Sequence, residues 1–381
     1  MDAFTTPSNW QRVRLGDICE IVKGQQINKI SLNNTDKYPV INGGIDFLGY
    51  TNKFNVSKNT IAISEGGTCG YVRFMKSDFW SGGHNYSLQK ISNKVNNLCL
   101  YHILKSYEKD IMKLGVGSGL KNIQLKALKD FEIPLPPLNE QIAIANILSD
   151  VDRYLYSLRA LILKKESVKK ALSFELLSQR KRLKGFNQAW QRVKVKDFGI
   201  IITGSTPLTQ ISEYWNGTIS WITPTDINDN KDIFNSERKI TQKGLDTIRM
   251  IPKNSVLVTC IASIGKNAIL RVNGACNQQI NAIIPNKDFN ADFVYYLMEN
   301  NKQYLLGKAG VTATYIISKQ VFEEIDFFVP KDLNEQIAIA NILSDLDSEI
   351  ISLKNKKRQF ENIKKALNHD LMSAKIRVLN K

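Results

Sequence analysis

Two long stretches of the chain place apolar residues at alternating steps of three and four, which is the spacing of a helix with one buried stripe. The first stripe runs from Ile144 to Leu176 and the second from Ile339 to Leu371. Each stripe has ten positions, of which eight are apolar and two are lysines. They are Ile144, Leu148, Val151, Leu155, Leu158, Ile162, Lys165, Lys169, Leu172 and Leu176 in the first, and Ile339, Leu343, Leu346, Ile350, Leu353, Lys357, Phe360, Lys364, Leu367 and Leu371 in the second. We predict two long helices that pack on each other as an intramolecular antiparallel coiled coil. The alternative is that each helix packs only on its own globular domain.

The same run of residues, NEQIAIANILSD, begins both helices, at 139–150 and again at 334–345, an offset of 195 positions. Asn139 and Asn334 are suitable N-caps, each followed by Glu in the first turn. The segments upstream also open alike, with WQRV at 10–13 and at 190–193. A buried face tolerates many different hydrophobic sequences, so an identical copy suggests that the same partner binds at both places.

The repeat divides the chain into two variable blocks and two nearly constant ones. The variable blocks are 1–137 and 187–332, and the constant helical blocks are 138–186 and 333–381. Short apolar runs at 59–63 and 254–259 predict strands, and helices are expected near 101–114 and 291–306. The predicted fold is α/β (α+β): two globular domains separated by two long antiparallel helices, with an internal pseudo-two-fold repeat.

Composition narrows the class of partner. The length of 381 residues favours two or more domains, and the formal net charge of +16 favours a polyanion such as nucleic acid. A basic but merely solvated surface is the alternative. The five cysteines are scattered without a C-x-x-C pair, which favours reduced thiols over disulfides or a metal site. We expect a cytoplasmic protein, because no apolar run has the length of a membrane span.

No catalytic signature is complete. A phosphate-binding P-loop needs Ser or Thr after Gly-Lys, but Gly265 and Lys266 are followed by Asn267. The Asn-Pro-Pro-aromatic motif of adenine methyltransferases is absent from the sequence. Glu237 and Lys239 have the E-x-K spacing of some nucleases, a coincidence that a basic chain produces by chance. We therefore expect no catalytic residue, no metal site and no cofactor bound by this chain.

Polar recognition chemistry remains, on loops rich in amide, hydroxyl and basic side chains. Asn and Gln pair with adenine, Arg and Lys with guanine, and Ser, Thr and Lys bind phosphates. The candidate DNA-binding residues are Lys23, Gln25, Gln26, Lys29, Arg73, Asn85, Lys121, Asn122, Ser205, Thr206, Thr223, Thr225, Lys266, Asn277, Gln278, Gln279, Thr312, Thr314 and Tyr315. The alternative for each is a turn residue, and Trp215 and Trp221 are expected in the core.

Together these features resemble the specificity (S) subunit of Type I restriction-modification systems, over essentially the whole chain. The similar segments are the helix entries Pro134…Leu138-Asn-Glu-Gln-Ile142 and Pro330…Leu333-Asn-Glu-Gln-Ile337, the opening WQRVRLGD at 10–17, and ITGSTP at 202–207 with EYW at 213–215 and ISWITP at 219–224. The resemblance implies that each variable block is a target recognition domain that reads one half of a bipartite double-stranded DNA site.

The resemblance also implies partners. The helices would be spacers and docking surfaces for two methyltransferase (M) subunits, which bind S-adenosylmethionine and methylate adenine N6. Restriction (R) subunits of such complexes use ATP and Mg to translocate and cleave DNA. The residues expected to bind the M subunits are Asn139, Glu140, Gln141, Asn334, Glu335 and Gln336.

Three other classes stay open at this point. One is a stand-alone DNA-binding protein without a methyltransferase partner, whose helices would serve only each other. The second is a tethering coiled-coil protein, which two large non-repetitive domains argue against. The third is an enzyme, which the missing motifs argue against.

Overall fold

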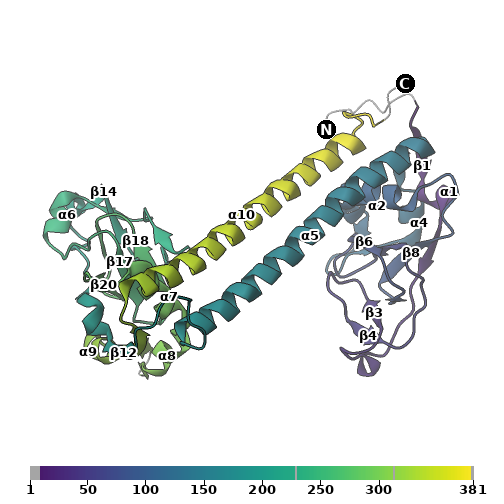
Figure 1. Cartoon of the computed structure of the whole chain (residues 1–381). Helices are drawn as coiled ribbons and strands as arrows, with labels where there is room; N and C mark the ends of the chain where they lie inside the picture. Colours follow the sequence, from purple (N-terminus) through teal and green to yellow (C-terminus); the bar gives the residue numbers. More distant parts are fainter. Residues whose placement is uncertain (1–8, 228–229, 312–313, 379–381) are drawn as a thin grey trace. The chain divides into compact units, whose positions relative to one another are not determined.

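The computed structural model describes residues 9–227, 230–311 and 314–378, so the candidate Thr312 lies outside the described residues. The chain divides into two compact units. Unit 1 is Met1–Arg159 with Asn355–Lys381, and unit 2 is Ala160–Lys354. Helix α5 (Leu138–Leu177) and helix α10 (Leu333–Met372) each contribute one part to each unit. Both helices are 40 residues long, which confirms the two predicted helices (Figure 1).

The globular domain of unit 1 has a larger and a smaller sheet. Its elements are β1 (Gln11–Arg14), α1 (Leu15–Ile18), β2 (Glu20–Lys23), η1 (Lys29–Ser31), β3 (Tyr38–Ile41), β4 (Gly49–Thr51), β5 (Thr60–Ser64), β6 (Val72–Met75), β7 (Trp80–Ser81), β8 (Asn85–Gln89), α2 (Asn97–Ser106), α3 (Glu108–Lys113), β9 (Gly115–Val116), β10 (Asn122–Ile123), α4 (Leu125–Lys129) and β11 (Glu132–Leu135). The larger sheet has the order β2-β8-β5-β6 and the smaller one β4-β3-β7, while β1 pairs with β11.

The globular domain of unit 2 repeats this plan. Its elements are β12 (Trp190–Lys194), η2 (Val195–Phe198), β13 (Gly199–Thr203), η3 (Ser212–Tyr214), β14 (Trp215–Ile222), β15 (Asp232–Ile233), β16 (Lys239–Ile240), α6 (Gln242–Asp246), β17 (Ser255–Thr259), β18 (Asn267–Leu270), β19 (Gly274–Cys276), β20 (Ile280–Pro285), α7 (Ala291–Asn300), α8 (Lys302–Gly307), β21 (Gly310–Val311), β22 (Tyr315–Ile316), α9 (Lys319–Glu324) and β23 (Asp326–Pro330). The sheets are β13-β20-β17-β18-β15 and β16-β14-β19, and β12 pairs with β23.

The predicted strands and helices of the variable blocks exist, with one difference. The runs at 59–63 and 254–259 form β5 and β17, as expected. Each helix expected near 101–114 and 291–306 is instead two helices, α2 with α3 and α7 with α8. The breaks fall at Tyr107 and Asn301, whose backbone angles are not helical. Among the described residues, no helix is both long and apolar enough to cross a membrane.

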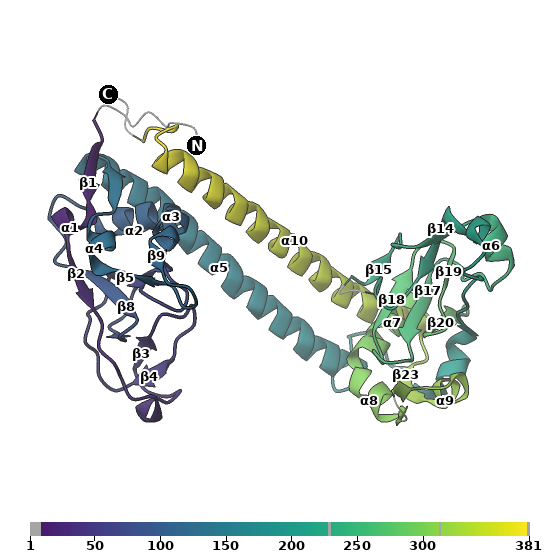
Figure 2. The same ribbon diagram turned by 180° about the vertical axis from the view of Figure 1, so that it is seen from behind.

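The main core of each unit lies between the larger sheet, one short helix and the start of one long helix. In unit 1, Ile61 of β5 and Leu100 of α2 belong to the same buried cluster as Ile144 and Leu148 of α5. In Figures 1 and 2 the smaller sheet of this unit lies at the end of the domain away from α2. In unit 2 the corresponding cluster joins β17, α7 and the Ile339–Leu343 turn of α10.

The long helices pack against each other within each unit, along the predicted stripe. In unit 1 the ring of Tyr154 on α5 lies 4.5 Å from the ring of Phe360 on α10, centroid to centroid. Ion pairs lie on or beside the stripe in both units: Arg159 pairs with Glu361 at 2.8 Å, and the stripe residue Lys165 pairs with Glu349 at 2.7 Å. The stripe is therefore a helix–helix seam, and the alternative in which each helix packs only on its own domain is wrong.

The lysines of the stripe carry a repeated polar junction. Lys364 bonds to Asp152 in unit 1, and Lys169 bonds to Asp347 in unit 2. Both partners of the second pair follow from those of the first by the offset of 195. In unit 2, Tyr296 of α7 donates its hydroxyl to Asp347 at 2.8 Å.

The corresponding position of α2 in unit 1 is His102, which is buried like Tyr296. Each lies six residues after the N-cap of its helix, Asn96 in unit 1 and Asn290 in unit 2. Burial, followed by the positive charge of Lys364, lowers the pKa of His102 to about 4, while Asp152 acts in the opposite direction. The imidazole is therefore neutral at pH 7.

Each long helix begins with a buried carboxylate that fixes the first strand of its domain. In unit 1, Trp10 Nε1 donates to Glu140 Oε2 at 3.2 Å, and the Arg377 guanidinium donates to both oxygens at 3.0 and 3.2 Å. Glu140 is only 3% exposed. We call this arrangement, and its counterpart in unit 2, the carboxylate latch.

The latch of unit 2 is built from corresponding residues. Trp190 Nε1 donates to Glu335 Oε1 at 3.3 Å, and Arg182 donates to the two carboxylate oxygens at 3.2 and 2.7 Å. Arg182 lies beyond the end of α5 and Arg377 beyond the end of α10, again 195 positions apart. Each latch thus joins the start of one long helix to the segment that follows the other.

A buried glutamine next to each latch fixes the loop before α2 or α7. Gln141 accepts from Asn96 N at 2.7 Å and donates to the carbonyls of Lys94 and Pro136. Gln336 makes the same set of bonds, accepting from Asn290 N at 3.0 Å and donating to two carbonyls. These two residues are no more than 1% exposed.

The expected partner-binding set therefore needs a correction. The side chains of Glu140, Gln141, Glu335 and Gln336 are buried and bonded within their own unit, so they present no surface to a second protein. Asn139 and Asn334 remain exposed at the helix starts. Part of the identity between the two helices thus has an internal cause: the same buried polar contacts are made twice.

We predict that Glu335→Ala lowers the free energy of unfolding by about 3–5 kcal/mol, because it leaves the Arg182 guanidinium beside a buried site without its carboxylate. Urea unfolding of the full chain, followed by circular dichroism, measures the loss. The matched control is Glu349→Ala, which removes a solvent-exposed ion pair and should cost less than about 1 kcal/mol. Equal losses in the two variants would show that the latch is not a major source of stability.

A second prediction concerns acid. The folded pKa of His102 lies below the unfolded value, so as the pH falls the unfolded chain takes up this proton first, and stability is lost between about 6.5 and about 4. Replacing His102 by Tyr, the residue at the corresponding place in unit 2, should remove about 2 kcal/mol of the loss between pH 7 and pH 5. Urea titrations at the two pH values measure it. The reciprocal variant Tyr296→His should increase acid sensitivity, and an unchanged pH profile in both variants would contradict the assignment.

Candidate nucleic-acid interface

In unit 1 several polar loops meet at one end of the larger sheet. These loops are 24–28, 42–48, 65–70, 82–84 and the 115–123 hairpin, which we call the unit 1 loop cluster. Backbone bonds join them: Gln25 N donates to Ser81 O at 2.8 Å, and Glu65 N donates to His84 O at 2.9 Å. The side chain of Asn42 accepts from His84 N at 3.0 Å. The cluster is therefore one connected surface.

Glycines allow these loops to approach closely. A Cβ added at Gly24 would lie 2.2 Å from Gly82 O, and one added at Gly66 would lie 2.3 Å from Asn122 Oδ1. A Cβ at Gly83 would lie 2.5 Å from the Gln26 amide nitrogen. The exposed amides of Gln26 and Asn122 are thus held against the backbone of neighbouring loops. Such placement favours directional hydrogen bonding to a partner.

The unit 2 loop cluster is built in the same way from 204–208, 223–226, 260–266, 277–279 and 314–316. Ser205 N donates to Cys276 O at 2.8 Å, as Gln25 N does to Ser81 O in unit 1. The Thr206 hydroxyl donates to Gln278 Oε1 at 2.7 Å. Two exposed candidates, Thr206 and Gln278, are therefore neighbours in space although 72 positions separate them.

A tryptophan supports the first loop of each cluster. In unit 1, Trp80 Nε1 donates to Gln25 O at 2.9 Å, and in unit 2, Trp221 Nε1 donates to Ser205 O at 3.0 Å. The two tryptophans come from different strands of the smaller sheet, β7 and β14. Trp221 is buried, as expected, and Trp215 is half-buried.

Several candidates occupy the clusters with exposed side chains. Lys23 pairs with Glu65 at 2.7 Å, and Thr223 donates to Asp226 at 2.7 Å, which makes Thr223 part of a turn. The other candidates on cluster loops or beside them, with exposed or half-buried side chains, are Gln25, Gln26, Lys29, Lys121, Asn122, Ser205, Thr206, Thr225, Gln278, Gln279, Thr314 and Tyr315. Lys121 and Tyr315 lie on corresponding hairpins. Lys121 precedes β10, whose Ile123 N donates to Glu65 O in the loop after β5, and Tyr315 begins β22 and accepts from Ala262 N in the loop after β17.

Four candidates lie elsewhere or are used internally. Asn85 and Asn277 are buried, and the Asn277 side chain closes a turn by accepting from Gln279 N at 3.1 Å. The Arg73 guanidinium donates to Gly44 O at 3.1 Å and to Ile45 O, and so holds the 42–48 loop. Lys266, the last residue of the 260–266 loop, lines a hollow beside Tyr295 and Glu299. Asn85, Asn277 and Arg73 are therefore buried or bonded within the fold, whereas the Lys266 side chain is exposed beside the hollow.

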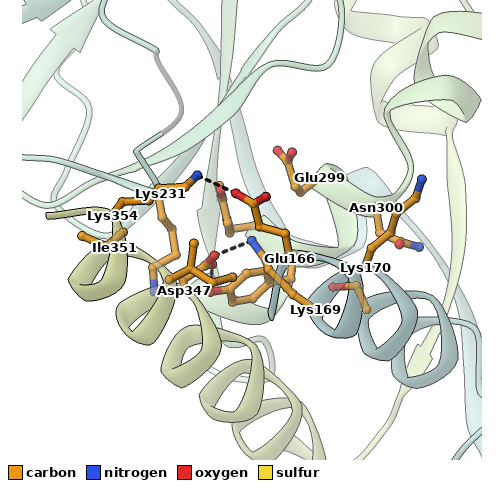
Figure 3. Close-up of a pocket in the computed structure, with 13 residues that line it drawn as sticks. Glu166, Lys169, Lys170, Lys231, Glu299, Asn300, Asp347, Ile351 and Lys354 are labelled. Atoms are coloured by element: carbon orange, nitrogen blue, oxygen red, sulfur yellow. Dashed lines mark hydrogen bonds and ion pairs between the residues drawn. The ribbon is translucent and has the colours of Figure 1, made fainter. Parts of the chain in front are cut away.

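A larger hollow of about 490 Å³ lies in unit 2 where α5, α10 and α7 meet (Figure 3). Its charged groups pair with one another: Lys169 bonds to Asp347, and Lys354 pairs with Glu166 at 2.7 Å. Unit 1 has a corresponding hollow of about 420 Å³. The charged residues of the unit 1 hollow occupy the positions that correspond, at the offset of 195, to those of the unit 2 hollow. They are Asp152, Arg159, Glu361 and Lys364 in unit 1, matching Asp347, Lys354, Glu166 and Lys169 in unit 2. Paired charges in both hollows indicate structural junctions.

Two further observations bear on chemistry. Within the part of the chain that the structure describes, no three His, Cys, Asp or Glu residues are grouped so as to hold a metal ion. The cysteines are free thiols, and burial raises the pKa of Cys99 and Cys260 to about 12. These thiols are protonated at neutral pH and poor nucleophiles.

Sequence reasoning missed the arginines of the latches and the tryptophans that support the first loop of each loop cluster. Arg182 and Arg377 were visible as a pair at the offset of 195, beyond the last apolar position of each stripe. Trp80 gave no such signal, because its partner in function, Trp221, lies on a different strand.

A family model described as the Type I restriction modification DNA specificity domain matches this chain twice, over residues 7–166 and 187–362. The Type I restriction enzyme MjaVIII specificity subunit of Methanocaldococcus jannaschii is 26% identical over 417 residues, which cover 100% of this chain and 96% of that protein. The MjaIX specificity subunit of the same organism is 36% identical over 182 residues, 46% of this chain and 41% of that protein. Relatives at 36% to 40% identity are matched over only 41% to 43% of their own length.

The fold is shared with a solved structure, the S subunit of a Type I restriction-modification system from M. genitalium. The TM-score is 0.69 at 22% identity, and the match covers 95% of this chain and 96% of the other. The two family matches coincide with the two repeated domains and most of each long helix. This chain therefore belongs to the Type I restriction modification DNA specificity domain family.

Proposed function

We propose that this chain is the non-catalytic specificity subunit of a Type I restriction-modification complex. Each globular domain reads one half of a bipartite double-stranded DNA target, and the long helices dock two methyltransferase subunits. The observation that carries the proposal is that corresponding loops build the same polar cluster twice, once in each unit. Two half-sites require two readers of one design with different side chains, and the clusters differ in their side chains.

The amide and hydroxyl groups of the clusters support base reading. Gln25 and Gln26 are exposed in unit 1, and Thr206 with Gln278 forms a bonded pair in unit 2. Amides suit adenine, and hydroxyls suit phosphates or either base of a pair. The formal net charge of +16 supports a polyanionic partner.

An outward stripe on each long helix supports docking of two identical partners. Some residues of the repeated segment belong neither to the latch nor to the core. Those at 139, 142, 146 and 150 are spaced so that they share one face of the helix. The residues are Asn139, Ile142, Asn146 and Asp150 on α5, and Asn334, Ile337, Asn341 and Asp345 on α10. We call these two sets the outward stripes.

Internal packing does not account for the identity of the outward stripes. Asn146, Asp150, Asn341 and Asp345 are exposed, and Ile142 is 43% exposed although it is a large aliphatic residue. Exposed positions are ordinarily free to vary, whereas here both copies keep the same polar and apolar order. A partner met twice by the same face accounts for that constraint.

The proposal divides the chemistry among subunits. The methyltransferase subunits hold S-adenosylmethionine, and restriction subunits hold ATP and Mg, so this chain supplies recognition and binds no cofactor. Both activities act on genomic DNA, which places the complex in the cytoplasm of a bacterium or archaeon. A stand-alone DNA-binding protein is the second candidate, and co-purification from the native cell distinguishes the two: a methyltransferase recovered with this chain supports the first.

If phosphate contacts supply much of the affinity, the logarithm of the binding constant should fall linearly with the logarithm of salt concentration, by about 0.9 per neutralised phosphate. Fluorescence anisotropy of the complex on labelled duplex DNA between low and physiological salt measures this slope. A flat response would contradict an electrostatic interface.

Replacing Asn146 and Asn341 by Arg should block docking, because a bulky charge would stand in the centre of each outward stripe. The free energy of unfolding of the isolated chain should change by less than about 0.5 kcal/mol, as for most exposed sites. Size-exclusion chromatography with the methyltransferase subunit reads out docking. The control is Lys356→Glu on α10, also exposed but outside the stripes. Normal assembly of the double arginine variant would exclude the outward stripes as the docking face.

A further inference from the structure

An arginine lies over the rings of two tryptophans beside the unit 2 loop cluster. The Arg238 guanidinium lies 4.1 Å from the ring centroid of Trp215 and 4.8 Å from that of Trp221. The two indoles meet edge to face, with centroids 5.1 Å apart. Cation–π contacts with two rings that stand nearly at right angles confine the guanidinium, and its N–H groups remain available to acceptors. The side chain is held in place before any ligand arrives.

The backbone beneath Arg238 is fixed as well. Its carbonyl accepts from Trp221 N at 3.2 Å and from the Ser236 hydroxyl at 2.6 Å. The preceding residue, Glu237, donates its N–H to Asp226 at 2.9 Å, and Asp226 also accepts from Thr223. Arg238 is thus attached to the same turn that carries the candidates Thr223 and Thr225.

The two tryptophans beneath Arg238 contact the unit 2 loop cluster directly. Trp221 donates to Ser205 O, and Trp215 Nε1 donates to Leu208 O at 3.3 Å, so both rings brace the 204–208 loop. In Figures 1 and 2 the strand β14 and the helix α6 lie at the end of unit 2 opposite α8 and α9. Across the described ranges of the chain, no carboxylate forms an ion pair with Arg238, whereas Arg192 pairs with Asp326 and Arg271 with Asp232.

At the position in unit 1 that corresponds to Arg238, the chain carries a glycine. Ser81 and Cys276 correspond, because each carbonyl accepts from the first loop of its cluster. Ser81 pairs with Ile41 and Cys276 with Ile222, so the preceding residues, Val40 and Trp221, also correspond. The residue across from Val40 on β4 is Gly49, and the residue across from Trp221 is Arg238. A glycine occupies in unit 1 the place that the arginine occupies in unit 2. The feature therefore distinguishes the two domains.

We propose that Arg238 is a specificity-determining residue that reads a guanine in the half-site bound by unit 2. A planar, oriented guanidinium with free edges matches the O6 and N7 acceptors of guanine in the major groove. Because unit 1 carries Gly49 at this place, the contact belongs to one half-site only. The proposal rests on the proposed DNA-recognition function and deepens it.

The test is selection from a random duplex library by the full chain in complex with its methyltransferase subunits. The native complex should select a guanine at one position of one half-site. Arg238→Ala and Arg238→Lys should each lose at least about fivefold of that preference, while preferences at other positions stay unchanged. Lys keeps the charge but lacks the flat fork, and Arg238→Gln should move the preference at that position toward adenine.

Matched controls separate the alternatives. Arg192→Lys, another exposed arginine of unit 2, should leave the selected sequence unchanged, and thermal unfolding checks that each variant is folded. A phosphate contact predicts a different result, in which Arg238→Ala weakens binding equally on every sequence and Arg238→Lys behaves as native; that outcome, or an unchanged guanine preference in all three variants, overturns the assignment. A native complex that binds DNA without sequence preference would instead overturn the proposed function itself.

Discussion

The buried carboxylate at the start of each long helix is the contact on which both units depend. Glu140 and Glu335 each accept from an indole N–H at the start of the domain, Trp10 just before β1 and Trp190 in β12, and from a guanidinium in the segment after the other helix. A charge in such a place is tolerated only when its partners are all present. The latch therefore joins three parts of the chain at once: the start of the domain, the start of one long helix and the segment after the other.

Much of the architecture was predictable from periodicity and repetition, while the roles of polar residues were not. The stripes predicted both helices because an aliphatic spacing of three and four has one structural reading over so long a run. Burial was harder to foresee for Glu140, Gln141 and Asn85, since these residue types are usually exposed and become buried only where specific partners satisfy them. The internal role of Arg73 was hidden for a related reason: its guanidinium bonds the backbone of a loop 28 to 29 positions away, which no local pattern reveals.

The repeated segment NEQIAIANILSD has an inward face and an outward face, and the structure shows which residues belong to each. The inward residues of the repeated segment make the same latch and the same glutamine bonds in each unit, so their identity has an internal cause. The outward residues, among them Asn146 and Asn341, are exposed and their identity is left for an external partner to explain. The same short sequence thus provides a buried face and an exposed face. A substitution on the exposed face should leave the buried contacts intact.

The division of the helices between the units has a consequence for how the chain is made. Unit 2 is one continuous segment, Ala160–Lys354, whereas unit 1 needs both Met1–Arg159 and Asn355–Lys381. The latch of unit 2 joins residues 153 positions apart, and that of unit 1 joins residues 237 positions apart. Domains fold as their residues leave the ribosome, so the second domain along the chain has all of its parts first. The first domain must wait for Asn355–Lys381 to be synthesised before the end of α10 can pack against the start of α5.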